Sequence, residues 1–129
     1  MPGSSVFWAW PFEQQNELGG QLPPKHPENL EPHFPRNLGP AAHTTLVAVA
    51  TDAPLTSNQT KRLAIMAQDG LARALRPVHA PQDGDTVFAL STTGTSDATD
   101  TVSIEILARL GALAADCTAR AIARGVFEA

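Results

Sequence analysis

The sequence predicts an α/β fold, and three observations lead to that prediction. Two short apolar runs, residues 44–51 and 85–92, have the length and composition of buried strands. A helical pattern separates them, and a second one follows the later run. The order strand, helix, strand, helix is typical of parallel strands joined by a right-handed crossover. The 129 residues suffice for one modest domain, so residues 1–129 are either a single domain or a fragment of a larger protein.

The N-terminal segment alternates as a strand does over residues 5–13. Four large apolar side chains at every second position would share one face: Val6, Trp8, Trp10 and Phe12. Pro11 favours an edge position or the end of that strand. Residues 19–43 contain six prolines, which forbid a sustained helix or ladder, so we expect a loop there. So long a loop is unusual inside a compact domain, but it offers the accessible backbone that cleavage requires.

The run of residues 44–51 is apolar on both faces, which predicts a strand that is covered on both sides. It ends at Asp52-Ala53-Pro54. Thr56 and the glutamine three residues later form a capping box at the start of a helix. Apolar residues then recur at helical spacing from Leu63 to Leu75, and Pro77 ends the helix.

The second strand is predicted over residues 85–92, after which Gly94 and Ser96 turn the chain. The last helix is expected from about Asp100 to Arg124, with Gly125 as its C-terminal cap. Cys117 lies in the middle of this helix among alanines and is expected to be a small core residue.

Thr44 begins the first strand, and Asp83 and Asp85 precede the second. A right-handed crossover would bring the amino ends of both strands to one edge of the sheet, so we expect these residues to be neighbours. Being two apart, the two aspartates would point to the same side. A plainer alternative remains: Thr44 is a good strand former, and Asp83-Gly84-Asp85 is a turn that leads into a strand.

Cleavage of the bond between His43 and Thr44 would make Thr44 the first residue of its own polypeptide. Its α-amine, with an unperturbed pKa of about 7.7–8.0, would then accept the hydroxyl proton at neutral pH. A nearby aspartate would orient the protonated amine or the hydroxyl, as the third member of a catalytic triad does. The hydroxyl would first attack its own preceding carbonyl, and the resulting ester would hydrolyse.

The bulk composition excludes several classes of protein. A net charge of −4 gives no electrostatic footprint for nucleic acid or anionic lipid, and no apolar run approaches the roughly 18 residues of a membrane span. The absence of a secretory signal pattern and the single cysteine favour a cytoplasmic protein without internal disulfides. The four histidines lack zinc-type spacing, so no metal is expected: His26, His33, His43 and His79.

Several motifs, in this order and spacing, resemble the L-aminopeptidase/D-esterase family, which includes β-aminopeptidases and nylon-oligomer hydrolases. They are Phe7–Glu13, Leu18-Gly19-Gly20, Thr44–Leu55, Lys61-Arg62-Leu63-Ala64, Asp69–Arg73, Arg76-Pro77-Val78-His79 and Asp83–Ala89. The resemblance covers nearly the whole chain. It implies a self-cleaving N-terminal-nucleophile hydrolase of linear amides, built as a four-layer α/β/β/α sandwich, needing no cofactor and assembling as a homo-oligomer of processed subunits.

The resemblance also implies roles for individual residues. Thr44 would be the nucleophile, with Asp83 and Asp85 as the acidic groups beside it. A threonine followed by Asp-Gly-Asp is more similar to the nylon-oligomer hydrolases than to the aminopeptidases, which tend to have serine and a Ser-Gly-Glu-like element. His43 departs from the Asn or Gly that often precedes the nucleophile in the family.

By resemblance the chain is only the C-terminal third of a family member. Residues 1–18 would belong to the large subunit as a strand segment, residues 19–43 would be the loop that ends at the cleavage site, and residues 44–129 would be the small subunit. The missing N-terminal portion would supply the oxyanion donors and much of a pocket for small peptides or oligoamides, so we expect the isolated chain to be nearly inactive. The alternative is a non-catalytic fragment or assembly subunit that keeps the fold without its chemistry.

Overall fold

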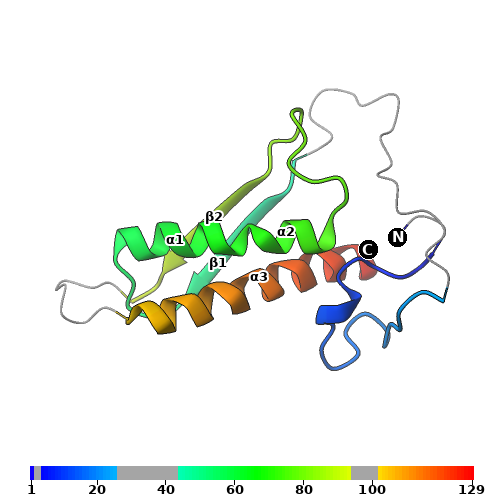
Figure 1. Cartoon of the computed structure of the whole chain (residues 1–129), viewed down its shortest axis with the longest axis horizontal. Coiled ribbons are helices and arrows are strands. Elements are labelled where there is room, and N and C mark those ends of the chain that lie inside the picture. The colour runs from blue at the N-terminus through cyan, green and yellow to red at the C-terminus, as the bar shows by residue number, and fades with distance from the viewer. Residues whose placement is uncertain (2–3, 26–43, 94–101) are drawn as a thin grey trace.

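A computed structural model describes residues 1, 4–25, 44–93 and 102–129. Two parallel strands lie side by side, and helices cover one face of this small sheet (Figure 1). In chain order the elements are the 3-10 helix η1 (Trp10–Phe12), β1 (Leu46–Thr51), α1 (Ser57–Ala67), α2 (Asp69–Ala74), β2 (Thr86–Ser91) and α3 (Ile104–Phe127). The prediction of an α/β fold with strand, helix, strand, helix from residue 44 is confirmed.

The two strands pair in parallel, as the crossover rule predicts. Leu46 lies opposite Thr86 and Thr51 lies opposite Ser91. One further bond extends the ladder toward the amino ends of the strands, because Thr86 N donates to Thr45 O at 3.0 Å. The amino ends of both strands therefore meet at one edge of the sheet.

The capping box is confirmed at the start of α1. Thr56 Oγ1 accepts from Gln59 N at 3.2 Å, and Gln59 Oε1 accepts from Thr56 N at 3.0 Å. The single predicted helix is divided at Gln68 into α1 and α2. Leu71 N donates to Gln68 O at 3.0 Å, which is the tighter i→i−3 pattern, and Gly70 beside it has low helix propensity.

The prediction of a strand over residues 5–13 is wrong. The segment instead turns repeatedly, with Trp10 N donating to Phe7 O and Phe12 N donating to Ala9 O. Pro11 fixes the backbone of η1 in a helical region. No ladder partner lies beside this segment among the described residues, and it packs on α3 as an irregular chain. Of the predicted loop, residues 19–25 form no helix or strand, and residues 26–43 lie outside the described part.

Three expectations for the last helix are also corrected. Ser103 caps α3 by accepting from Ile106 N at 3.2 Å, so the helix begins after Asp100, which lies outside the described residues together with Gly94 and Ser96. Gly125 is not a cap, because α3 continues to Phe127. Cys117 is exposed, because it falls between the positions that α3 buries: Gly111, Ala114, Ala115, Thr118, Ala119 and Ala123.

Two apolar clusters form the core. One lies between the sheet and the helices, where inward-facing strand residues such as Val49 and Val87 pack on Leu63 and Ala114. The other lies beneath the N-terminal segment, where Leu18 and Ala9 pack on Ala119 and Ala123. An ion pair between Glu17 and Arg120 closes the second cluster, and Arg120 Nη2 donates to Glu17 Oε2 at 2.9 Å. The N-terminal segment is thus held to α3 by both apolar and ionic contacts.

The opposite face of the sheet is uncovered. Leu46 is 70% exposed, Phe88 60% and Leu90 46%, and all three point away from the helices. The prediction that the first strand is covered on both faces is therefore wrong for this chain, because its helices form a single layer. No helix in the described ranges is both long and apolar enough to cross a membrane.

The close approach of α2 to α3 at Gly70 gives a first prediction. A Cβ at Gly70 would collide with Ala115 O and lie 2.5 Å from Thr118 Cβ, so Gly70→Ala should destabilise the chain by about 1–3 kcal/mol. Gly125 is the matched control, because a Cβ there meets nothing within 4 Å and Gly125→Ala should stabilise α3 by about 0.5–1 kcal/mol. Urea denaturation of both variants measures the change in the free energy of unfolding. Equal changes in the two variants would contradict the packing argument.

The ion pair of Glu17 gives a second prediction. The hydrogen bond from Arg120 lowers the pKa of Glu17 below 4.5, so its stabilising contribution is fully present above pH 4.5 and is lost as the pH falls through the lowered pKa. Glu17→Gln should therefore flatten the dependence of the free energy of unfolding on pH below pH 4.5. Arg120→Gln removes the cause of the shift and should flatten the same window. If the free energy of unfolding depends on pH in both variants as steeply as in the wild type, the stabilising role of the Glu17–Arg120 ion pair is refuted.

Candidate active site

Thr44 and Gly84 meet at the edge of the sheet where both strands begin. Continuing the register by two residues places Thr44 opposite Gly84. The Thr44 side chain is exposed, and a Cβ built on Gly84 would lie 2.6 Å from Thr44 Oγ1. The hydroxyl therefore lies directly over Gly84, on the uncovered face of the sheet.

Asp85 connects three segments on the other face. Its Oδ1 accepts from Thr45 N at 2.9 Å, while its Oδ2 accepts from His79 N at 3.3 Å and lies 3.0 Å from His79 Nδ1. The side chain is only 5% exposed, so these partners replace water for a nearly buried carboxylate. Asp85 thus fixes the residue next to Thr44 rather than the Thr44 side chain itself.

Asp83 closes a turn. Its Oδ2 accepts from Ala80 N at 2.7 Å, and its own N donates to Ala80 O at 2.8 Å. Both aspartates therefore bind residues of one loop, Asp83 at Ala80 and Asp85 at His79. Within the described residues no hydrogen bond joins either carboxylate to the Thr44 hydroxyl. His43 lies outside the described residues.

Two residues at this edge were not predicted as part of the site. Gly84 leaves the space for the Thr44 hydroxyl, and the register would have indicated it, since 44 lies opposite 84 when 46 lies opposite 86. His79 belongs to one of the resemblance motifs and was excluded as a metal ligand, but no role in the site was predicted for it, and it contacts Asp85. Its left-handed backbone, with φ of 53°, is not visible in the sequence. In the described part of the chain no three His, Cys, Asp or Glu side chains gather as a metal ion would require.

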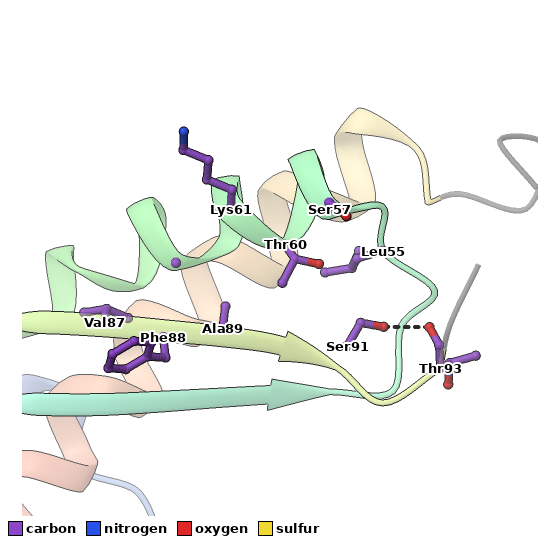
Figure 2. Close-up of a pocket in the computed structure, with 10 residues that line it drawn as sticks. Leu55, Ser57, Thr60, Lys61, Val87, Phe88, Ala89, Ser91 and Thr93 are labelled. Carbon is purple, nitrogen blue, oxygen red and sulfur yellow. Dashed lines mark hydrogen bonds between the residues drawn. The ribbon is translucent and has the colours of Figure 1, made fainter. Parts of the chain in front are cut away.

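A separate groove of about 490 Å³ lies between α1 and β2 (Figure 2). Its polar lining consists of hydroxyl groups and Lys61, whose side chain is directed away from β2 in Figure 2. Ser91 Oγ is already engaged, since its one proton has two carbonyl acceptors within reach, Ala53 O at 2.7 Å and Thr93 O at 2.8 Å. Among the described residues, none of the predicted site residues lines this groove, and its described lining has no carboxylate or imidazole to activate a nucleophile.

The fold and the site together define a class of protein. It is a parallel α/β unit that carries one hydroxyl and two carboxylates where its two strands begin. Residues 9–129 match the family model described as Peptidase family S58, and the chain belongs to that family. The relationship to an aminopeptidase family, indicated by the motifs, is confirmed at this level.

The relatives carry aminopeptidase names. An uncharacterized aminopeptidase of Mycobacterium tuberculosis is 44% identical over 94 residues, which cover 67% of this chain and 27% of the relative. An uncharacterized aminopeptidase of Mycobacterium leprae is 45% identical over 97 residues, which cover 69% of this chain and 26% of the relative. The chain thus spans about a quarter of the length of these curated relatives.

The contact between Gly84 and Thr44 gives a third prediction. Gly84→Ala should displace the Thr44 side chain, because the added methyl would lie 2.6 Å from Thr44 Oγ1. The effect on the free energy of unfolding should stay within about 1 kcal/mol, because both residues are exposed. Three-bond couplings and the methyl resonance of Thr44 report the rotamer, with Gly125→Ala as the control substitution. Unchanged Thr44 couplings in Gly84→Ala would contradict the placement of the hydroxyl.

Proposed function

We propose that this chain is the C-terminal part of a self-cleaving N-terminal-nucleophile amidohydrolase, of aminopeptidase or nylon-oligomer hydrolase type, that works in the cytoplasm. The observation that carries the proposal is the exposed Thr44 hydroxyl over Gly84, beside a backbone N–H that is anchored by Asp85. Membership of Peptidase family S58 supports the choice of amide bonds as the substrate.

Self-cleavage would proceed in two steps. Thr44 Oγ1 attacks the carbonyl carbon of His43, its proton passes to the departing amide nitrogen, and an ester replaces the peptide bond. Water then hydrolyses the ester, leaving the carboxylate of His43 and a free amine on Thr44. On this proposal, residues 19–43 would precede the cleaved bond, and residues 44–129 would become the small subunit.

The released amine would then serve as the base for substrate turnover. With a pKa near 8 in water, it takes the hydroxyl proton as Thr44 attacks the substrate carbonyl, and it returns that proton to the leaving amine. Water afterwards releases the acid from the acyl-enzyme. Asp85 holds Thr45, and with it the amine, while Asp83 keeps the adjacent turn closed. No cofactor enters this scheme.

The proposed packing site for the rest of the enzyme is the uncovered face of the sheet. Sheets of parallel strands are normally buried on both faces, yet Leu46 and Phe88 are exposed on the face to which Thr44 belongs. A large subunit would consist of the remaining portion together with residues 1–18. The remaining portion would cover this face, complete a four-layer α/β/β/α sandwich, and form the pocket for small peptides or oligoamides. Homo-oligomers of such processed units are the proposed assembly.

Intact mass spectrometry of the full-length protein that contains this chain tests the proposal. A break between His43 and Thr44 is expected, Thr44→Ala should abolish it, and Thr44→Ser should retain it, because serine also carries a hydroxyl. Thr45→Ala is the matched control and should be cleaved, since it keeps the N–H that Asp85 binds. For the 129-residue chain alone, a 13.6 kDa species and little amidase activity are expected.

The alternative function is that of an assembly subunit without chemistry. In the same experiment, this alternative predicts that the bond between His43 and Thr44 stays intact in the assembled protein. Thr44→Ala would then leave the mass pattern unchanged. Assays on peptide amides, β-amino-acid amides and aminohexanoate oligomers then sort the substrates of a cleaved enzyme.

A further inference from the structure

We propose that His79 is a positioning residue for the nucleophile, acting through a hydrogen-bonded network of Gln68, His79 and Asp85 that ends at Thr45. The inference rests on the proposed function of Thr44 and deepens it. His79 makes no contact with the Thr44 hydroxyl among the described hydrogen bonds, so it acts through Asp85 and not on the substrate.

The backbone of His79 is shaped for this contact. Its φ of 53° lies in the left-handed region, which is strained for a residue with a Cβ and persists only when neighbours enforce it. In this conformation both the main-chain N and Nδ1 of His79 reach the same oxygen, Asp85 Oδ2, at 3.3 and 3.0 Å. The left-handed turn therefore presents two donors to one carboxylate oxygen.

Gln68 is the partner that selects the ring tautomer in this network. Its Nε2 lies 3.3 Å from His79 Nε2, and in this orientation the amide nitrogen donates and the ring nitrogen accepts. The proton of the neutral imidazole then resides on Nδ1 and is donated to Asp85 Oδ2. Gln68 sits at the junction of α1 and α2, so the break in that helical region supplies a side chain to the site.

With Oδ2 held by His79, the other oxygen of Asp85 is directed at the main chain of the first strand. Oδ1 accepts from Thr45 N at 2.9 Å, one residue after Thr44. Removing the imidazole would leave a nearly buried carboxylate with fewer donors and free to rotate. Thr45, and with it Thr44 above Gly84, would lose its fixed position.

Asn and Gly at position 79 form a matched pair of variants. Both tolerate a positive φ, so neither disturbs the backbone of the turn. Asn offers Nδ2–H in place of the imidazole Nδ1–H, whereas Gly keeps only the main-chain donor. If the turn has only a structural role, the two variants should behave alike in both measurements below. If the side-chain donor positions Asp85, only the Gly variant should differ from wild type.

The first measurement uses NMR on the uncleaved chain. Long-range ¹⁵N correlations should show the Nδ1–H tautomer of His79. Exchange of the Thr45 amide hydrogen should speed up by about tenfold or more in His79→Gly, the loss expected for a hydrogen bond to a charged group, and should stay near wild type in His79→Asn. An Nε2–H tautomer, or equal exchange in both variants, overturns the network.

The second measurement is the rate of self-cleavage of the full-length protein. His79→Gly should slow it by about tenfold or more, and His79→Asn should restore it. Wild-type protein that never cleaves refutes the proposed function, while the NMR result still decides the network. Cleavage that is equally fast in His79→Gly and wild type refutes the positioning role and leaves the proposed function standing.

Discussion

The register of the two parallel strands is the constraint on which the rest of this structure depends. Since Leu46 lies opposite Thr86, Thr44 falls opposite Gly84, and side chains alternate between the two faces from there. The Thr44 hydroxyl is placed on the open face, and Asp85 is placed on the opposite face, where it binds Thr45 N. Sliding one strand by a single residue would move its side chains to the other face and break the hydrogen bond between Thr45 N and Asp85.

Contacts on the helix side and at both strand ends hold this register. Val49 and Val87 alternate inward and pack on α1 and α3, which fixes the buried face. At the amino end Asp85 binds Thr45 N, and at the carboxyl end Ser91 Oγ donates to Ala53 O at 2.7 Å. Hydrogen bonds thus hold both ends of the strand pair, and apolar packing holds its middle. The residues at the amino ends of the strands are therefore fixed relative to the core.

The sequence predicts the elements that local signals decide. The capping box at Thr56, both strands and their direction follow from short-range patterns and the crossover rule. The N-terminal strand failed because alternation needs a ladder partner, and Gly125 failed as a cap because the Phe127 ring packs against Phe7 at 6.4 Å. Topology predicted that Thr44 and Asp85 are neighbours. That they lie on opposite faces of the sheet depends on the strand register. The contact between His79 and Asp85 depends on a backbone conformation that residue spacing does not reveal.

The position of Thr44 on the uncovered face links assembly to chemistry. In the chain alone its hydroxyl faces water beside Leu46, and fixed dipoles stabilise a developing negative charge far less in water than in a closed site. On the proposed function, a subunit that buries Leu46 and Phe88 also excludes water from Thr44. On that proposal, the apolar contact that drives association would also close the site around Thr44, which lies beside the exposed Leu46 and not in the groove between α1 and β2.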